Sequence, residues 1–247
     1  MRMTSRSPAP FFYQQGKRGI LLVHGFTGST AEMGPMGEFF ADQGWTVHAP
    51  LLAGHGTTPE ELGATSWEDW LCSAEEGIKV LQKAGCTQLF AAGHSMGGLL
   101  VLQLAQRYPL QAIATLSTPM VVQDRFFPFV GFLKHFKTNH ERRSRKPSHI
   151  EEKIIPYPYT PLESIDQLRR LLRDTRRSIK KVTTPIFIAQ SGRDETVQPQ
   201  SGALLYEKVG SIHKELKIYP KSSHIITLDH ERKQLFQDVL QFFVAHS

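Results

Sequence analysis

The 247-residue sequence is 40% hydrophobic and 21% charged, with a formal net charge of +6, which is typical of a globular protein with a sizeable core. Its apolar runs are far shorter than the ~20 residues that span a bilayer, and residues 1–10 lack the apolar stretch of a secretory signal. The cysteines, Cys72 and Cys86, do not form a C-x-x-C pair, which argues against a disulfide framework or a metal site. We therefore expect a cytoplasmic protein without a metal or cofactor.

The positive charge is concentrated in one segment. Between Arg125 and Lys181 the sequence has 15 Lys or Arg and 6 Asp or Glu, whereas the rest of the chain is slightly acidic. A solvated helical surface is the simplest interpretation, and contact with an anionic membrane surface or an acidic partner is the alternative. We do not expect nucleic-acid binding, because the sequence contains no recognised nucleic-acid-binding module.

The first half of the chain alternates between apolar runs typical of buried parallel strands and segments with helical spacing. A serine or threonine of the stretch Gly25–Thr30 can cap the first helix, Gly44 ends it, and Ser66 with Asp69 has the form of a capping box. The stretch 50–62, rich in Gly, Pro and Thr, predicts a loop. The predicted strands are 11–13, 19–24, 45–49, 89–93 and 111–118, and the predicted helices are 33–40, 66–83 and 96–107.

The alternation stops after Pro119 and resumes near Leu162. Between them the sequence is rich in Phe, Pro, Lys, Arg and His, with no clear periodicity. Strands are predicted again at 185–190 and 215–219, and helices at 164–180, 199–209 and 232–246. Such alternation predicts an α/β fold, with a mainly parallel sheet covered by helices on both faces. Residues 1–119 and 163–247 would form the core, and residues 120–162 an inserted cap.

The stretch Gly93-His94-Ser95-Met96-Gly97 has the form G-x-S-x-G and lies between a predicted strand and a predicted helix. That context is the one a nucleophile elbow requires, because the serine sits on a sharp turn that exposes its hydroxyl. Glycines two residues to either side avoid steric collisions there. Ser95 is therefore the candidate nucleophile, although a glycine-rich turn with an incidental serine shares the pattern.

A serine hydroxyl needs a base to act as a nucleophile at neutral pH. His224 follows the last predicted strand and is the candidate base, and Asp194, in the loop after the preceding strand, would orient it. Taken singly, each is also an ordinary loop residue. Together they follow separate strands in the order Ser, Asp, His, which is the order found in α/β-hydrolases, and active sites of open α/β sheets lie at that edge.

An acyl-transfer site also needs N–H donors for the oxyanion. The backbone N–H of Met96 follows the nucleophile, and the second donor is expected from the loop His24–Gly28, with Phe26 as the choice. The side chains of Phe26 and Met96 would then be free to line an acyl pocket. His24, His94 and His55 are interpreted as structural residues.

Four stretches resemble bacterial carboxylesterases and monoacylglycerol lipases of the α/β-hydrolase superfamily: His24-Gly25-Phe26-Thr27-Gly28, Gly93–Gly98, Gly192-Arg193-Asp194-Glu195 and Ser223–Asp229. The resemblance implies an α/β-hydrolase fold with a small cap over an apolar acyl channel. It also implies a cap glutamate that holds the glycerol hydroxyls. Glu151 or Glu152 lies in the corresponding region, with Glu152 preferred, although this cap is more basic than the family pattern.

These features predict a serine hydrolase of carboxylic esters, either short- to medium-chain acyl esters or monoacylglycerols. The acyl-enzyme would form on Ser95, and the partner would be a small-molecule ester. A thioesterase or acyltransferase with the same triad is an alternative. A non-catalytic binding module is disfavoured by the complete triad. Epoxide hydrolases and haloalkane dehalogenases are disfavoured because they normally carry an aspartate in place of Ser95. The oligomeric state is not predicted.

Overall fold

The computed structural model describes residues 7–124, 127, 130–133, 139–141 and 146–247. Most of the predicted elements are present with shifts of one to three residues at their ends. The main strands are β1 Phe11–Tyr13, β2 Arg18–Val23, β3 Thr46–Ala49, β4 Gln88–His94, β5 Ala112–Leu116, β8 Ile186–Ser191 and β9 Lys214–Tyr219. The helices are α1 Gly34–Asp42, α2 Pro59–Gly63, α3 Trp67–Lys83, α4 Met96–Leu104, α5 Val130–Leu133, α6 Ser148–Glu151, α7 Leu162–Ser178, α8 Gln200–Lys208 and α9 Arg232–Ala245.

The main strands form one seven-stranded sheet in the order β1-β3-β2-β4-β5-β8-β9. Only β1 runs antiparallel to its neighbour in this sheet, so the prediction of a mainly parallel α/β fold is confirmed. The register places Val23 of β2 beside Gly93 of β4. Because parallel strands end at the same edge, the loop after β2 and the turn after β4 emerge side by side.

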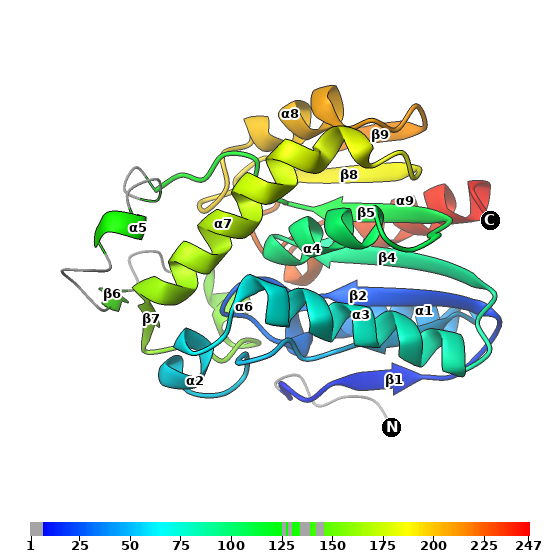
Figure 1. Cartoon of the computed structure of the whole chain (residues 1–247). Coiled ribbons are helices and arrows are strands. Elements are labelled where there is room, and N and C mark those ends of the chain that lie inside the picture. The colour runs from blue at the N-terminus through cyan, green and yellow to red at the C-terminus, as the bar shows by residue number, and fades with distance from the viewer. Residues whose placement is uncertain (1–6, 125–126, 128–129, 134–138, 142–145) are drawn as a thin grey trace.

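Helices cover both faces of this sheet (Figure 1). One apolar core lies between the sheet and α3, α4, α7 and α8, with side chains such as Leu71, Leu99 and Leu171. The other lies between the sheet and α1 and α9, with Phe40 and Phe243 among its buried residues. Strands buried on both sides explain why β2 and β4 are continuous apolar runs rather than alternating ones.

The segment 120–162 leaves the sheet after β5 and returns through α7 to β8. Its elements α5, β6 (Asn139–Glu141) and β7 (Tyr159–Pro161) lie beyond the end of the sheet toward which the strand arrows of β2, β4 and β5 point (Figure 1). A bridge between Val122 and Val197, with a hydrogen bond from Gln123 N to Thr196 O of 2.9 Å, ties the start of this segment to the loop after β8. The segment therefore lies against the edge where the candidate nucleophile, base and acid were predicted.

Two local predictions differ from the structure. Neither Ser29 nor Thr30 caps α1. A 3-10 turn over Thr30–Glu32 intervenes, and the Thr30 hydroxyl donates instead to Ala9 O at 2.6 Å. The stretch 50–62 is not loop throughout, because α2 begins at Pro59 with Thr58 accepting from Glu61 N. The capping box at Ser66 is confirmed, with reciprocal bonds to Asp69.

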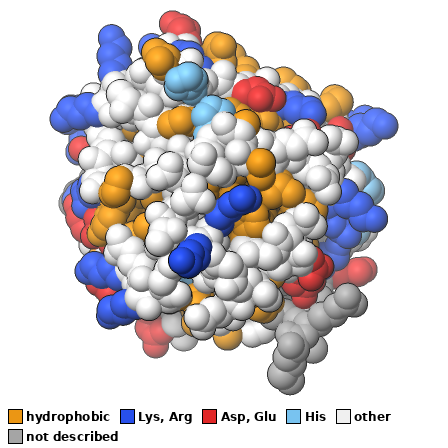
Figure 2. Space-filling model, turned by 90° about the vertical axis from the view of Figure 1, so that its right-hand side faces the viewer, with side chains coloured by type: hydrophobic (Ala, Val, Ile, Leu, Met, Phe, Trp, Pro, Cys, Tyr) orange, Lys and Arg blue, Asp and Glu red, His pale blue; other side chains and the backbone are white. Residues whose placement is uncertain are grey.

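The charges on the described surface are mixed. On the face at the right-hand side of Figure 1, Lys or Arg side chains lie beside a hydrophobic patch near the centre, and further basic and acidic side chains are scattered toward the edge (Figure 2). In α7, the buried carboxylate of Asp166 pairs with Arg169 and Arg170. Six of the basic residues behind the membrane-surface prediction lie outside the described residues, so it stays a prediction: Arg125, Lys134, Lys137, Arg142, Arg143 and Arg145. Within the described ranges, no helix has both the length and the apolar character needed to cross a membrane.

Candidate active site

Ser95 lies on the tight turn between β4 and α4, with φ 51° and ψ −118°. A non-glycine residue in this left-handed region is strained, and such strain is typical of a nucleophile elbow. The flanking glycines are required for steric reasons. A Cβ on Gly93 would lie 2.2 Å from the carbonyl oxygen of Gly97, and one on Gly97 would lie 2.2 Å from that of Val23. The strained elbow predicted from the sequence is therefore present.

The structure brings Ser95, His224 and Asp194 together from three separate loops. His224 Nε2 lies 3.0 Å from Ser95 Oγ, and His224 Nδ1 lies 2.9 Å from Asp194 Oδ2. The second carboxylate oxygen of Asp194 accepts the backbone N–H groups of Thr196 at 2.9 Å and Val197 at 2.7 Å. All three side chains are almost fully buried. The aspartate is thus fixed by its own loop and can hold one tautomer of the imidazole in place.

The surroundings of His224 favour the neutral imidazole. Burial lowers the pKa of His224 below its usual value, Asp194 opposes this shift, and the nearby charges of Lys146 and His94 add to it. Burial would raise the pKa of Asp194, but His224 and the two backbone N–H groups outweigh burial and lower it. At neutral pH the imidazole is therefore uncharged and the carboxylate ionised, as a general base and its orienting acid require.

The loop after β2 folds into a tight turn, closed by a hydrogen bond from Gly28 N to Gly25 O of 3.2 Å, with Thr27 at φ 57°. Phe26 lies inside this turn, and its ring packs 5.8 Å from Trp70 and 6.3 Å from His55, centroid to centroid. Met96 is the first residue of α4. Of the two residues chosen for their backbone N–H groups, Phe26 therefore lies on the loop after β2 and Met96 at the start of α4, directly after Ser95.

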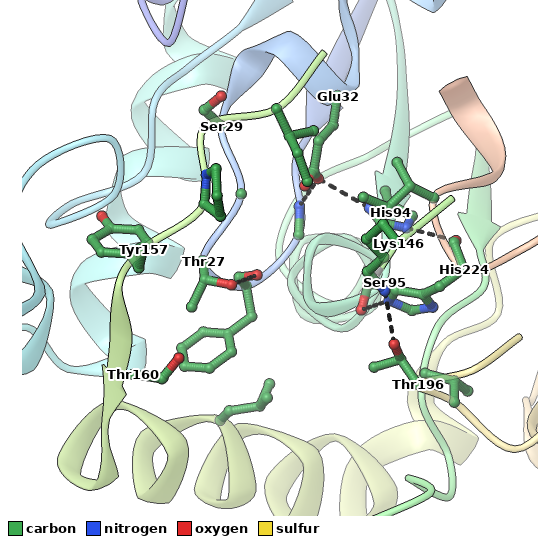
Figure 3. A pocket seen from close by; sticks show the side chains of 18 of the residues that line it. Thr27, Ser29, Glu32, His94, Ser95, Lys146, Tyr157, Thr160, Thr196 and His224 are labelled. Atoms are coloured by element: carbon green, nitrogen blue, oxygen red, sulfur yellow. Dashed lines mark hydrogen bonds and ion pairs between the residues drawn. The ribbon is translucent and has the colours of Figure 1, made fainter. Parts of the chain in front are cut away.

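Only one of their two side chains lines the cavity over Ser95. Phe26 does so, as predicted, but Met96 is fully buried in the core between the sheet and α3. The cavity measures about 220 Å³. Its outer wall comes largely from the segment 120–162, in particular Ile154, Ile155 and Tyr157. Figure 3 shows Tyr157 and Thr160 on one side of the cavity and Ser95 with His224 on the other.

A lysine that sequence reasoning missed stands beside His224. Lys146 lines the cavity, and its ammonium group lies 2.5 Å from Glu195 Oε1 and 3.0 Å from Thr196 Oγ1. Glu195 in turn accepts the backbone N–H of His224 at 3.0 Å. The only available signal was the basic composition of the segment, which does not single out one lysine. By contrast, Glu152 is exposed and is not among the described residues that line the cavity, so the structure does not bring it to the site.

Three other histidines near the site, interpreted from the sequence as structural residues, are each held by hydrogen bonds. His24 Nε2 accepts from Leu52 N at 3.2 Å, and its Nδ1 lies 2.9 Å from Gly25 O. His55 bonds to Ala53 O, and burial lowers its pKa to about 3. His94 is unusual because it forms a buried ion pair with Glu32, with 3.1 Å between His94 Nδ1 and Glu32 Oε2. Glu32 was not singled out from the sequence.

Comparison with known proteins agrees with this geometry. Residues 14–231 match the family model described as serine aminopeptidase, S33. The chain is 34% identical over 236 residues to a carboxylesterase of Bacillus subtilis (strain 168), covering 96% of each protein. It is 33% identical over 243 residues to a thermostable monoacylglycerol lipase of Bacillus sp. (strain H-257), covering 96% of this chain and 95% of the relative.

Solved structures of other proteins share the fold of this chain. A structure from work on LipS and LipT, two metagenome-derived lipolytic enzymes, superposes with a TM-score of 0.90 and 30% identity, covering 97% of this chain and 98% of the other. A soluble variant of monoglyceride lipase from Saccharomyces cerevisiae has a TM-score of 0.79 at 17% identity, covering 96% and 91%. The second likeness shows the fold alone.

The fold and the relatives together define an α/β-hydrolase of the serine hydrolase class that acts on esters. Within that class, the chain belongs to the family described as serine aminopeptidase, S33, together with carboxylesterases and monoacylglycerol lipases.

Proposed function

We propose that Ser95, His224 and Asp194 form the catalytic triad, and that the enzyme hydrolyses monoacylglycerols and short- to medium-chain carboxylic esters. The observation that carries this proposal is the continuous hydrogen-bonded chain from Ser95 Oγ through His224 to Asp194, with links of 3.0 and 2.9 Å. The backbone N–H groups of Phe26 and Met96 are proposed as the oxyanion hole.

In the proposed reaction, His224 Nε2 takes the proton of Ser95 Oγ as the oxygen attacks the ester carbonyl. The tetrahedral intermediate places its oxyanion toward the N–H groups of Phe26 and Met96, where each donor contributes about 3–4 kcal/mol to transition-state stabilisation. The carbon–oxygen bond to the alcohol then breaks, and His224 gives the proton to the leaving alcohol. Water, deprotonated by the same imidazole, releases the acid and restores Ser95. The proton transfers use Ser95, His224 and Asp194, which are already joined by hydrogen bonds.

We assign residues 120–162 the role of a cap. Supporting this, Ile154, Ile155 and Tyr157 form an apolar wall over Ser95, which suits an acyl chain. A volume of about 220 Å³ is small for a ligand pocket, since typical pockets measure roughly 300–1,000 Å³. A short or medium chain therefore fits better than a long one.

On the alcohol side, Lys146 is the proposed polar contact. An ammonium group has three N–H donors, and the contacts with Glu195 and Thr196 use two of them. The third is available to an oxygen of the leaving alcohol, such as a glycerol hydroxyl. In this proposal Lys146 takes the role that the family resemblance gave to Glu152, which is exposed.

Labelling with a fluorophosphonate tests the nucleophile. The label is expected on Ser95 alone, and the Ser95→Ala variant is expected to lose both the label and the esterase activity. A label at another residue, or full activity in Ser95→Ala, contradicts the triad.

A substrate panel tests the chemistry and the preference separately. It varies acyl length and alcohol independently and includes acyl-CoA thioesters and aminoacyl amides as alternative substrates. Faster turnover of thioesters would favour a thioesterase, and turnover of amides alone would favour a peptidase. Lys146→Met is expected to raise the KM for monoacylglycerols but not for simple alkyl esters. Lys153→Met, on the same segment but outside the described cavity lining, is the matched control.

A further inference from the structure

Glu32 and His94 form a buried ion pair beneath the loop that carries Phe26. Glu32 follows the loop after β2, and His94 is the last residue of β4, directly before Ser95. Their side chains are only 6% and 2% exposed, respectively. Burying two charged groups is costly unless they are paired and hydrogen-bonded. Packing alone therefore does not explain why two charged groups are buried at this location.

The hydrogen bonds of the pair reach two parts of the catalytic machinery. Glu32 Oε2 accepts the backbone N–H of Gly25 at 3.0 Å, directly before Phe26. His94 Nε2 lies 3.0 Å from the carbonyl oxygen of His224. Figure 3 shows the resulting path, from Glu32 through the His94 ring to His224. The pair thus joins the proposed oxyanion loop to the backbone of the proposed general base.

The partners of the pair determine its charge. Both ring nitrogens of His94 face acceptors, a carboxylate and a carbonyl, so both bonds form only when both nitrogens carry protons. Burial would raise the pKa of Glu32, but the hydrogen bond and charge of His94, with further help from His24 and Gly25, lower it to about 2. The geometry therefore fits an ionised Glu32 carboxylate that faces a His94 ring donating from both nitrogens.

The fit around the pair leaves little room for movement. A Cβ on Gly25 would lie 3.0 Å from His94 Nδ1, and a Cβ on Gly28 would lie 2.2 Å from Glu32 Oε1. The oxyanion loop rests directly on the two charged groups. A shift of either side chain therefore moves the loop.

The backbone of His224 is held from both sides. Its carbonyl accepts from His94, and its N–H donates to Glu195 at 3.0 Å. The His94 and His224 rings lie 5.0 Å apart, centroid to centroid. His94 is thus close enough to influence the proton affinity of His224. Burial is the main cause that lowers the pKa of His224, and the charge of His94 adds to it.

We propose that the Glu32–His94 ion pair is a positioning element, which keeps the oxyanion loop and the general base aligned with Ser95. This inference rests on the proposed esterase function. Glu32 and His94 also line the cavity, but their hydrogen bonds run to the oxyanion loop and to the backbone of His224. The larger effect of the pair is therefore expected on kcat rather than on KM. A merely structural pair would instead affect the stability of the fold alone.

The test compares Glu32→Gln, His94→Gln and the double variant with the wild-type enzyme. Glutamine at position 32 keeps an acceptor for the Gly25 N–H but cannot stabilise an imidazolium. Because removal of an oxyanion donor costs about 10²- to 10³-fold in kcat, and here the donors are displaced rather than lost, kcat is expected to fall about 10- to 100-fold in each single variant. KM is expected to stay within about twofold, since uniform binding is unaffected.

Two readouts separate positioning from folding. The acid limb of the kcat profile is expected to move to higher pH in Glu32→Gln, because a neutral His94 no longer lowers the pKa of His224. The double variant is expected to lose no more activity than the worse single variant, since the two residues act as one unit. Asp166→Asn is the matched control. It removes a comparably buried carboxylate, paired with Arg169 and Arg170, away from the described cavity lining, and should lower stability but not kcat.

The outcomes are distinct from those for the esterase function. If wild-type enzyme hydrolyses no ester and Ser95 is not labelled, the proposed function fails. If wild type is active, but Glu32→Gln and His94→Gln melt at lower temperature with unchanged kcat and pH profile, the positioning role is overturned. Should Glu32→Gln fail to fold, His94→Gln, which breaks the same pair from its other end, decides the question by the same measurements.

Discussion

The close approach of Gly97 to β2 allows a sharp test of the proposed oxyanion geometry. In Gly97→Ala, the added Cβ would lie 2.2 Å from Val23 O and 2.6 Å from His24 O. Both contacts are with backbone atoms, so no side chain can rotate out of the way. Ordinary carbon–oxygen contact begins near 3.4 Å. The end of β2 and the loop that follows it must therefore move by about 1 Å relative to the elbow, a displacement that costs roughly 10²-fold in rate at a catalytic site.

We expect two effects of Gly97→Ala. Overpacking destabilises a core by about 1–3 kcal/mol, which lowers the melting temperature measurably. Displacement of the Phe26 N–H from the oxyanion position lowers kcat for a short-chain p-nitrophenyl ester by about 10²-fold, with a smaller change in KM. Stopped-flow labelling of Ser95 by a fluorophosphonate, whose oxygen occupies the same hole, is expected to slow in parallel.

Gly34→Ala is the matched control, because a Cβ on Gly34, the first residue of α1, would have no heavy atom within 4 Å. It is expected to leave kcat unchanged and to stabilise the protein by about 0.4–1 kcal/mol. If Gly97→Ala folds with wild-type stability and retains full kcat, the proposed contact between the elbow and the oxyanion loop is refuted.

Three further predictions concern charge. Lys146→Met removes a cation that lowers the pKa of His224, so the acid limb of the kcat/KM profile should move to higher pH; an unchanged limb would separate Lys146 from the general base. Asp194→Asn should leave the fold intact and lower kcat by about 10⁴-fold, as expected when the imidazole loses its orienting acid; a loss below about tenfold would argue against this role. The pKa of Glu32 falls from 4.5 to about 2 on folding, so its stabilisation, about 3 kcal/mol, is complete above pH 4.5 and is lost as pH falls through 2. Acid unfolding followed by circular dichroism should therefore be less steep in Glu32→Gln, and a slope equal to that of wild type would show that Glu32 does not contribute.

The core of the site was predictable because its residues follow strands. Ser95 and Asp194 come shortly after apolar runs typical of buried strands, and His224 follows the alternating edge strand β9. A parallel sheet brings such positions to one edge. The elbow also has a fixed local pattern, because its turn requires glycines at Gly93 and Gly97. For these residues, sequence spacing and backbone sterics were sufficient to predict the position of the site.

The charged residues around the triad were not predictable in the same way. Glu32 and His94 are 62 residues apart and meet only because β2 and β4 are neighbours. His94 occupies a variable position of the motif, so its identity carried no signal. Lys146 lies in a segment without periodicity, where composition predicts charge but not contact. Such contacts depend on tertiary geometry, and no fixed spacing in the sequence predicts them.

Two local errors have simpler causes. The helix α2 was missed although Thr58 and Pro59 form a recognisable helix start, because the surrounding glycines and prolines favoured a loop. Thr30 was a candidate to cap a helix, but its hydroxyl bonds to Ala9 O, a residue remote in sequence. A side-chain hydroxyl can form its hydrogen bond with a group that only the tertiary fold brings close.

The strands β5 and β8 are direct neighbours in the sheet, although the segment 120–162 and α7 lie between them in sequence. Backbone bonds from Gln123 N to Thr196 O and from Gln198 N to Val121 O, each 2.9 Å, pin the departure point of the segment to the loop that holds Asp194. Beyond that point, the length of the insertion does not alter the pairing of β5 with β8. The segment can therefore be exchanged without changing the order of the strands that carry the triad. A chimera that transplants the corresponding segment of a relative onto this core, joined after Gln123 and before α7, would alter the range of esters accepted while Ser95 remains the nucleophile. Its pH profile would also shift wherever the new segment lacks a counterpart of Lys146.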